Sequence, residues 1–325
     1  MRTNLEEDIS MHLDFVTFGE PLYMFYANEP GALEDVNDWS RALAGAETNV
    51  AAGLCRLGHQ TGLVTKLGED MLGRFITKAM AKEGIDTTGV QTTDERFTGW
   101  YIKEKNEEDD PAIEYFRKGS AASTMSVEDF DEDYFASADY MHVTSIFAAL
   151  SEDCYNFSKK AVEYMHKAGK VISFDPNLRP QLWDHDRMVE FVNETAKSVD
   201  IFLPGLEEGK LLTGLDKAED IAQFYLDRGV KIVIVKTGAS GAYYATSEGQ
   251  SGQVAGYQVT PIDTVGAGDG FAVGVISGLK EGLSLEDSIL RGNAIGARQV
   301  TFEGDNDGLP NQEELKEFMA NTKRA

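Results

Sequence analysis

The feature that most constrains the fold is a regular alternation of short apolar runs with amphipathic stretches from about residue 130 onward. The apolar runs read DYMHVTS, KVISFD, VDIFLP and VKIVIVKTG, and helical patterns at 151–169, 184–198 and 207–228 separate them. Strands rich in Val and Ile that alternate with helices are typical of βαβ units, whose parallel strands form one sheet covered on both faces. The sequence therefore predicts a doubly wound α/β fold.

The N-terminal third has a different pattern, which predicts a small additional β-sheet. An apolar strand at DFVTFG is followed by EPLYMFYANEPGALEDV, and two alternating strands follow later, at 99–103 and 112–117. An acidic loop, whose NEEDD run at 106–110 is expected to be a solvated tip, joins these two strands. We expect a β-lid that projects from the main sheet, with strands within about 20–45 and 97–120.

Composition limits the size, the partners and the compartment of the protein. The chain has 325 residues, of which 42% are hydrophobic, so a single domain over 1–325 with one large core is expected. The net charge of −25 argues against nucleic acid and anionic membranes as partners, and it means that any anion site must rest on local Arg, Lys or N–H groups. The N-terminus MRTNLEEDIS is unlike a signal peptide, and no apolar run is long enough to span a membrane, so a cytoplasmic location is expected.

The cysteines and histidines indicate neither a metal site nor a redox site. Cys55 and Cys154 each lie in a segment with a helical pattern, and we expect two buried thiols. The histidines at 12, 59, 142, 166 and 185 lack metal-ligand spacing and are expected in packing roles. The glycine-rich and acidic run TFEGDNDGLP lacks calcium-loop spacing and is interpreted as a surface turn.

The stretch DTVGAGDGF, at 263–271, has three glycines and leads into a helical pattern. Phe271, Val275 and Leu279 follow at i, i+4 and i+8, and Gly282 ends the pattern. Unpaired backbone N–H groups and the helix dipole make such a loop-to-helix junction an anion site. Asp269, in the first turn, has two interpretations, as a favourable charge on the helix dipole or as a reacting carboxylate.

Two other phosphate-binding motifs do not match. A G-x-x-x-x-G-K-[ST] loop needs Gly-Lys before Ser or Thr, but the Gly-Lys pairs here precede Val171 and Leu211. The dinucleotide pattern G-x-G-x-x-G is missed because the three glycines of the stretch are spaced two apart. A glycine-built anion hole beside a carboxylate suits phosphoryl transfer to an alcohol, in which a weak base such as Asp269 suffices without a raised pKa.

Two segments resemble the signatures of one family. DTVGAGDGF is similar to the C-terminal signature D-T-x-G-A-G-D-x-F of the ribokinase-like (PfkB) carbohydrate kinases, which is long and specific. AGAETNVAAGLCRLG, at 44–58, is similar to the N-terminal signature G-G-x-x-N-x-A of the same family. Both segments stand at the usual places, so the resemblance covers nearly the whole chain. It implies a ribokinase-like fold, with a mostly parallel sheet flanked by helices and a small β-sheet lid.

Within this family, the segments TGWYIK (98–103), YFRKGSAAS (115–123) and FDPNLRPQLW (174–183) look most like those of 2-keto-3-deoxygluconate kinases, and fructokinases share parts of them. In FGEPLYMFY no Asp follows Glu20, where fructokinase- and ribokinase-like members commonly have one. The resemblance implies ATP-dependent phosphorylation of the C6 hydroxyl of 2-keto-3-deoxygluconate. A fructokinase or another ribokinase-like sugar kinase is the alternative, and a non-catalytic sugar-sensing protein is a third hypothesis.

The resemblance also implies roles for individual residues. The catalytic group would comprise the base Asp269 and the anion hole of Gly266, Ala267 and Gly268. The sugar site would comprise Gly45, Ala46, Glu47, Asn49, Tyr101, Phe116, Arg117, Arg179 and Asp269. The ATP site would comprise Asn177, Arg179, Glu208, Lys236, Thr237, Gly238, Gly241, Gly266, Gly268 and Asn293. Two arginines suit a carboxylate, although each alone is more typical of a surface ion pair, and Asn293 alone of a helix surface.

The implied cofactors are ATP and Mg²⁺. The family's N-x-x-E element reads GLEE at 205–208, so that Glu208 is kept for indirect contact with Mg²⁺ but Gly205 replaces the Asn. Mg²⁺ is therefore expected to arrive mainly on ATP. Ala44 also departs from the family, in place of the first signature Gly. Asp263 has two interpretations, as a ligand of a monovalent cation or as a turn cap. Relatives often dimerise through the lid, and the resemblance therefore implies a homo-oligomer, either a dimer through the lid or larger.

Overall fold

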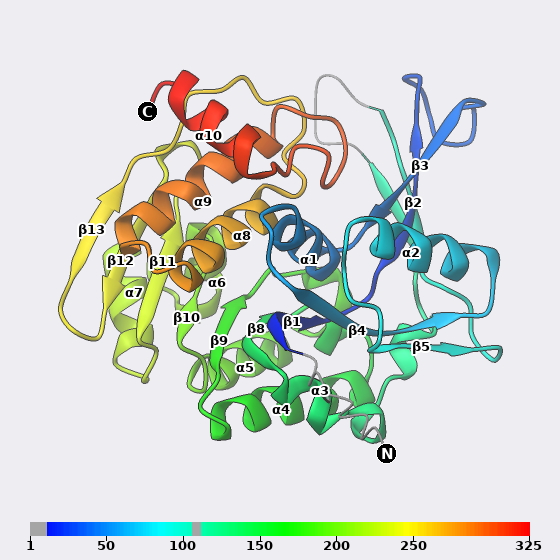
Figure 1. Ribbon diagram of the computed structural model, residues 1–325, viewed down its shortest axis with the longest axis horizontal. Coiled ribbons are helices and arrows are strands. Elements are labelled where there is room, and N and C mark those ends of the chain that lie inside the picture. Colours follow the sequence, from blue (N-terminus) through cyan, green and yellow to red (C-terminus); the bar gives the residue numbers. More distant parts are fainter. Residues whose placement is uncertain (1–11, 106–111) are drawn as a thin grey trace, which may run out of the picture.

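The computed structural model describes residues 12–105 and 112–325, so the expected loop tip at 106–110 lies outside the described residues. The described residues form a layered α/β body with a smaller β-sheet standing at one side of it (Figure 1). In Figure 1 the smaller sheet projects beside α1 and α2, and the C-terminal helix lies at the opposite upper edge of the body.

The main sheet has nine strands in the order β13-β12-β11-β10-β9-β8-β1-β4-β5. Their bounds are β1 Leu13–Phe18, β4 Thr61–Gly68, β5 Val90–Thr93, β8 Ala138–Thr144, β9 Val171–Asp175, β10 Ile201–Phe202, β11 Ile232–Lys236, β12 Ala242–Thr246 and β13 Ser251–Val254. All pairs from β11 to β5 are parallel, and β12 and β13 join antiparallel at one edge. The prediction of a doubly wound, mostly parallel sheet is confirmed.

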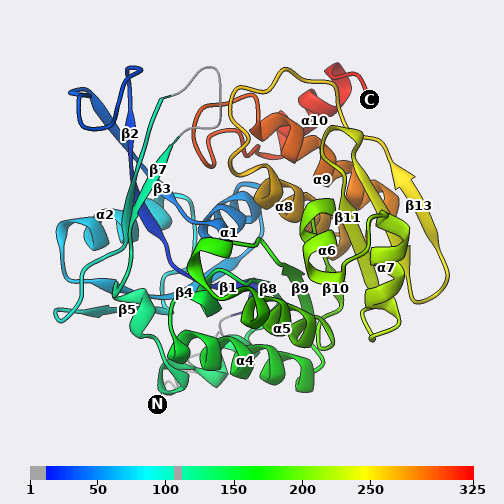
Figure 2. The same ribbon diagram turned by 180° about the vertical axis from the view of Figure 1, so that it is seen from behind.

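Helices cover both faces of this sheet (Figures 1 and 2). One face carries α1 Ala46–Arg56, α8 Ala267–Lys280, α9 Leu285–Gln299 and α10 Gln312–Asn321. The other carries α3 Glu132–Ala136, α4 Glu152–Lys167, α5 His185–Ala196, α6 Leu206–Thr213 and α7 Ala218–Leu226. The single helical segment expected at 207–228 is wrong in detail, because Gly214 adopts φ 74° and ends α6 before α7 begins.

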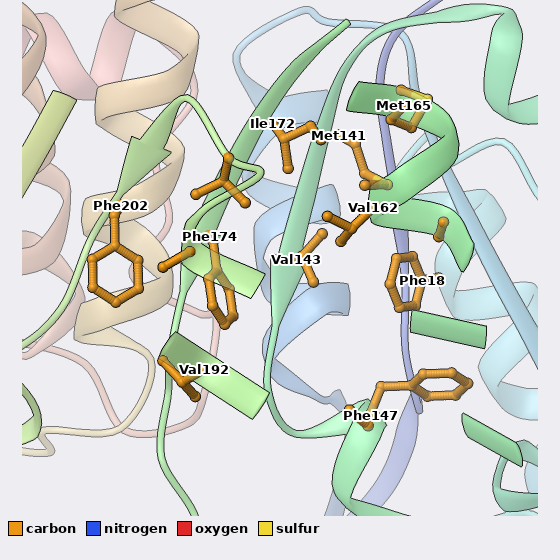
Figure 3. Packing of buried hydrophobic residues seen from close by; sticks show 14 of the residues in the cluster. Phe18, Met141, Val143, Phe147, Val162, Met165, Ile172, Phe174, Val192 and Phe202 are labelled. Carbon is orange, nitrogen blue, oxygen red and sulfur yellow. The ribbon is translucent and has the colours of Figure 1, made fainter. Parts of the chain in front are cut away.

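Continuous apolar runs form the central strands because both of their faces are buried. On one face, Phe18, Met141 and Phe174 pack against the helices of that side, and Figure 3 shows Val162 and Met165 of α4 lying over this part of the sheet. Residues that alternate with these, such as Phe15 and Ile201, belong to the core on the opposite face. The strand ends that follow these buried runs carry the polar residues of the site.

The smaller sheet, the lid, has four strands in the order β3-β2-β6-β7. Their bounds are β2 Leu22–Ala27, β3 Trp39–Ala44, β6 Trp100–Lys103 and β7 Ile113–Phe116. Pairs β2–β3 and β6–β7 are antiparallel, whereas β2 and β6 are parallel. Tyr101 lies opposite Tyr115, and Trp100 lies opposite Phe116, so strand alternation directs these two pairs to opposite faces of the lid. Helix α2 (Met71–Lys82) packs against the face that carries Trp100.

The two cysteines and two of the histidines differ in burial and in their polar partners. Cys154 is buried as expected and Cys55 is half-buried, and both are free thiols. His142 is buried, its Nδ1 lies 2.9 Å from Ser173 Oγ, and burial lowers its pKa to about 3, so it is neutral. His12 lies near Asp14 and Asp139, but the Lys280 ammonium already pairs with both of these carboxylates. In the described part of the chain, no helix combines the length and the hydropathy needed to cross a bilayer.

Candidate active site

A cavity of about 240 Å³ lies between the body and the lid, at the N-terminus of α8 and the carboxyl ends of the central strands. It brings together these expected residues: Gly45, Ala46, Glu47, Asn49, Tyr101, Arg117, Asn177, Arg179, Glu208, Lys236, Gly266, Gly268 and Asp269. It is also lined by residues that were not expected there, among them Glu20, Tyr115, Ile146, Asp175 and Asp305. Residues expected at the sugar and residues expected at the phosphates thus share one cavity.

The N-terminus of α8 can bind an anion because its first turn consists of small residues. Gly266 caps the helix with φ 78°, and a Cβ placed there would lie 2.0 Å from the carbonyl oxygen of Asp305, so only glycine fits. A Cβ placed on Gly268 would meet nothing closer than Lys236 Nζ at 3.6 Å, an ordinary van der Waals contact, so a methyl group would fit here without a clash. The first amides of a helix have no partner within it, and here they border the cavity.

Asp269 is buried at the floor of this cavity, with 8% of its surface exposed. Its Oδ2 accepts a hydrogen bond from Asn49 Nδ2 at 2.8 Å, and its Oδ1 accepts one from Asn177 Nδ2 at 3.3 Å. Burial raises the pKa of Asp269 to about 7, because it disfavours the charged form. The hydrogen bond from Asn49 lowers this pKa, and the negative charge of Asp175 raises it further. A carboxylate with such a pKa accepts a proton more readily than an ordinary aspartate at neutral pH.

The two asparagines reach Asp269 from different elements. Asn49 lies in the first turn of α1. Gly45 caps this helix, and its φ of 118° sets the direction in which the chain enters the helix. Asn177 follows strand β9 and adopts φ 42°, in the left-handed region that Asn tolerates better than most residues. The backbone N–H of Asn177 donates to Asp175 Oδ1 at 3.1 Å, which fixes this turn. Asp269 is therefore oriented by residues 220 and 92 positions away in the chain.

The two arginines of the cavity differ in their pairing. Nε of Arg117 lies 2.6 Å from Glu20 Oε2, and Ser120 Oγ donates to the other oxygen of the same carboxylate. Arg179 donates from Nη1 to the carbonyl oxygen of Leu178 at 2.9 Å, and among the described residues it forms no ion pair. The charge of Arg117 is thus balanced within the protein, whereas that of Arg179 is available to a ligand.

The part of the cavity where the sequence predicts phosphate binding is built on Lys236, at the end of β11. Its Nζ lies 2.6 Å from Asp175 Oδ2; burial lowers the pKa of Lys236, but the charges of Asp175 and Glu208 outweigh that effect and raise it. Glu208 accepts backbone N–H groups on both oxygens, from Leu178 and from Gly205, each at 2.7 Å. Glu208 therefore connects the turn after β9 with the start of α6, and the Gly at 205 contributes only its backbone to this contact.

A second groove continues from Lys236 and Glu208 past Thr237 and Gly238, which follow β11. Gly241 closes this turn with φ 100°, and its carbonyl oxygen accepts the Thr237 hydroxyl at 3.0 Å. The groove contains part of the segment expected to bind ATP.

Four of the residues expected at the anion hole, the sugar or ATP lie outside the linings of the cavity and of this groove, namely Gly241, Ala267, Asn293 and Phe116. Gly241 shapes the turn, and Ala267 begins α8 with its N–H directed to the carbonyl oxygen of Thr264 at 3.4 Å. Asn293 is buried and donates to the carbonyl oxygens of Val254 and Ala255, both at 3.1 Å, so it is not a helix-surface residue.

Phe116 lies on the far face of the lid, where its ring stacks on Trp100 with centroids 4.0 Å apart. A direct contact of Phe116 with the sugar is therefore not supported, and the neighbouring Tyr115 takes that face. The alternation of side chains in the strand was the signal, since Tyr115 pairs with Tyr101.

Asp305 corrects another expectation, because it lies in the segment interpreted as a surface turn. It is 7% exposed, and one of its carboxylate oxygens accepts the hydroxyl of Tyr101. Nothing in the local pattern of this segment indicates burial, because the contact comes from a strand 204 positions away.

Comparisons with known proteins identify the family. The pfkB family carbohydrate kinase model matches residues 13–312. A 2-dehydro-3-deoxygluconokinase from Bacillus subtilis is 50% identical over 313 residues, 95% of this chain and 96% of that protein. The crystal structure of a PfkB protein from Polaromonas sp. JS666 is 46% identical, with a TM-score of 0.87 over 94% of this chain and 99% of its own. A putative ribokinase II from E. coli, in complex with ATP and Mg²⁺, is 28% identical, with a TM-score of 0.88 over 95% and 99%.

These matches extend over nearly the whole chain and agree with the observed arrangement of sheet, helices and lid. The expectation of a ribokinase-like fold is confirmed. The expectation of a sugar kinase is confirmed as well. This chain belongs to the pfkB family of carbohydrate kinases.

Proposed function

We propose that this kinase transfers a phosphoryl group from ATP to the terminal C6 hydroxyl of 2-keto-3-deoxygluconate, also called 2-dehydro-3-deoxygluconate. The observation that carries the proposal is the position of Asp269, which shares one cavity with Tyr101 and Arg179 on the sugar side and with Lys236 on the phosphate side. The 50% identity to a kinase named for this sugar supports the choice of substrate.

In the proposed mechanism, Asp269 accepts the proton of the sugar hydroxyl. The hydroxyl oxygen forms a bond to the γ-phosphorus, while the bond from that phosphorus to the oxygen of the leaving ADP breaks. The amides of Gly266, Gly268 and Asp269 and the ammonium of Lys236 would stabilise the charge on the moving group. The raised pKa of Asp269 supports its role as the base, because proton acceptance is most effective when the pKa is near the working pH.

Arg179 is the residue that we propose to bind the carboxylate of the sugar acid. Its guanidinium lines the cavity and, among the described residues, forms no ion pair. Arg117 is paired with Glu20, so we propose that it supports the lid side of the cavity and contributes less to reading the acid. From the sequence, both arginines are expected to bind the carboxylate. Because only Arg117 is paired with a carboxylate of the protein, we propose different roles for the two residues.

The cavity fits Mg²⁺ that is carried by ATP better than a directly bound ion. Asp175 is paired with Lys236, and both oxygens of Glu208 accept backbone N–H groups, so neither carboxylate is free for direct ligation. When bound with ATP, Mg²⁺ would neutralise charge on the phosphates. Asp263, for which the sequence left a monovalent cation open, is paired with Lys103.

We further propose that residues 1–325 act as one kinase domain that assembles through its lid. The outer strands of the lid, β3 and β7, support such an interface, because each has one edge that pairs with no strand among the described residues. The consumption of ATP and the two free thiols support a cytoplasmic location. Light scattering of the purified protein measures the assembly directly.

The substrate is tested by coupled ADP release over a panel of 2-keto-3-deoxygluconate, fructose and ribose. We expect the highest kcat/KM with the sugar acid, and we expect Arg179→Met to reduce it by roughly 10²-fold because the carboxylate loses its charged partner. Arg187→Met, which removes an exposed arginine paired with Glu152, is the matched control. Equal or better use of fructose would favour the fructokinase-like alternative, and sugar binding without ADP release would favour a non-catalytic protein.

A further inference from the structure

Three segments that lie far apart in the sequence meet around the ammonium group of Lys103. This residue ends lid strand β6, and its side chain is 6% exposed. Its Nζ lies 2.5 Å from Asp263 Oδ2, in the loop that precedes α8, and 3.3 Å from Asp305 Oδ1, in the loop that follows α9. One buried cation therefore joins the lid to both loops at the start of the anion hole.

Both carboxylates around Lys103 are occupied by further donors. Asp263 Oδ1 accepts the N–H of Val265 at 3.0 Å, and its Oδ2 also receives the N–H of Gly304 at 3.4 Å. Asp305 accepts the hydroxyl of Tyr101, which lies two residues before Lys103 on the same face of β6. Without the ammonium, two buried carboxylates would face each other with no cation between them.

The same loops determine the position of Gly266. The carbonyl oxygen of Asp305 occupies the space where a side chain on Gly266 would lie, 2.0 Å from the ideal Cβ position. Gln299 Nε2 donates to the carbonyl oxygen of Gly304 at 2.7 Å and to that of Val265 at 3.4 Å. A displacement of Asp305 would therefore move Gly266 and the amides that follow it. Lys103 lies outside the lining of the main cavity, so its effect on the reaction is indirect.

We propose that Lys103 is a positioning residue whose ammonium group serves as a built-in monovalent cation for the anion hole. It holds Asp263, Asp305 and the loop of Gly266 in the arrangement needed for phosphoryl transfer, and it makes that arrangement depend on the lid. The inference rests on the proposed kinase reaction for its kinetic part, whereas its cation-binding part is independent of the sugar.

The surroundings of Asp263 fit the ammonium group of Lys103 better than a cation from solution. An ion such as K⁺ needs several oxygen ligands, but Lys103 and two N–H groups already point at this carboxylate. Burial lowers the pKa of Lys103, but the charge of Asp305 and the hydrogen bond to Asp263 outweigh that effect and raise it, so the group stays charged at neutral pH. Binding of K⁺ would require displacement of a tethered ammonium of the same charge.

The first experiment uses the wild-type protein at constant ionic strength. We expect kcat to change less than about twofold when K⁺ or NH₄⁺ at about 100 mM replaces tetramethylammonium, because the cation position is filled. Stimulation of wild-type kcat by K⁺ beyond that range would overturn the proposal. This arm needs no variant, so it decides the question even if substitutions at Lys103 prevent folding.

The second experiment uses Lys103→Ala, which opens the space that the side chain fills. We expect kcat to fall by roughly 10- to 100-fold, because the anion hole is misplaced, and K⁺ or NH₄⁺ to restore a large part of it. Lys103→Arg should retain more activity than Lys103→Ala without added cation. The matched control is Lys105→Ala, because Lys105 pairs with Glu303 of the same loop at the surface, and we expect no dependence on the cation there.

The melting temperature gives a readout that does not depend on catalysis. K⁺ or NH₄⁺ should raise the melting temperature of Lys103→Ala above the value in tetramethylammonium, and should leave the wild type unchanged. A folded Lys103→Ala protein that responds to neither cation, in melting or in kcat, would reduce Lys103 to a structural ion pair and overturn the proposal. If the wild type fails to phosphorylate the sugar acid, the proposed function fails, but the melting response still tests the cation site.

Discussion

At the scale of single residues, Asp269 takes its chemistry from its surroundings. In the sequence it is an acidic residue in the first turn of a helix, where a favourable charge on the dipole is the common role. In the structure it is buried, held by Asn49 and Asn177, and its pKa is raised to about 7. Burial next to Lys236 and the helix N-terminus distinguishes it from an ordinary capping carboxylate.

Asp269→Asn removes the proposed base while it keeps the shape of the side chain. We expect kcat to fall by roughly 10²- to 10⁴-fold with little change in ATP binding. For the wild type, kcat should fall as the pH drops below about 7, because the base becomes protonated. Stopped assays across pH 5.5–9 measure both effects, and near-normal turnover by the variant would exclude Asp269 as the base. Asp287→Asn, at the first turn of α9, is the control.

The same raised pKa predicts a stability cost at neutral pH. The folded state holds the proton of Asp269 up to about pH 7, whereas an unfolded aspartate releases it near pH 4, so the folded state binds more protons between these values. The free energy of unfolding from this group therefore falls as the pH rises through that window, by at most about 4 kcal/mol.

Urea unfolding of the ligand-free protein at pH 5 and pH 8 checks this prediction. The difference in free energy of unfolding between Asp269→Asn and the wild type should increase from pH 5 to pH 8 in favour of the variant. An unchanged difference would mean that Asp269 titrates near its ordinary value.

At the scale of elements, α8 combines the proposed anion site with very close helix packing. A Cβ on Gly274 would lie 2.5 Å from the backbone of Gly292 in α9, so the two helices touch at their backbones. Gly268, six residues earlier in the same helix, lines the cavity, and a Cβ placed on it would make only ordinary contacts. The two glycines of this helix therefore meet different requirements: Gly268 leaves room in the cavity, and Gly274 allows close contact with α9. The sequence pattern does not distinguish these two requirements.

The substitutions Gly268→Ala and Gly274→Ala distinguish the effect of a methyl group in the cavity from its effect on helix packing. Gly268→Ala should keep or slightly raise the melting temperature, since Ala favours the helix, but it should raise the KM for ATP because a methyl group enters the cavity. Gly274→Ala should destabilise the protein by roughly 1–3 kcal/mol, because two backbones must move apart. Thermal melts and initial rates measure both, and equal stability effects would contradict the assigned packing.

At the scale of the whole molecule, the charge and the lid determine how the site works. The net charge of −25 repels anionic substrates at long range. Inside the cavity, the positive charges of Arg179 and Lys236 and the amides of the α8 N-terminus offset this repulsion. The lid contributes Tyr101 and Tyr115 to the cavity and Lys103 to the loops behind it. Closure of the site is therefore a property of the body and the lid together.

The negative charge also predicts a salt effect on stability. Like charges repel each other in the compact state, so screening should raise the melting temperature by a few degrees between about 10 and 200 mM salt. Differential scanning calorimetry in sodium chloride and in tetramethylammonium chloride measures this effect. The two salts should act equally, because screening does not depend on the kind of cation; a fall in melting temperature would contradict the prediction.

The sequence by itself determined the class of fold, and it indicated the place where we propose that the reaction occurs. Alternating apolar and helical patterns set the parallel sheet, because both faces of its strands must be buried, and the GAGD stretch set a helix N-terminus with an acid beside it. These features are local, so a short window of residues contains them. Most of the expected cavity residues lie on motifs of this kind, such as Asn49, Asn177 and Lys236.

Only the tertiary structure decided which side chains meet. It buried Asp305 against Tyr101 and Lys103, and it paired Arg117 with Glu20 while Arg179 stayed without a carboxylate among the described residues. Each outcome depends on contacts between segments separated by many residues. A carboxylate or an arginine has the same local pattern whether it is paired or not, and only the packed structure shows its partner.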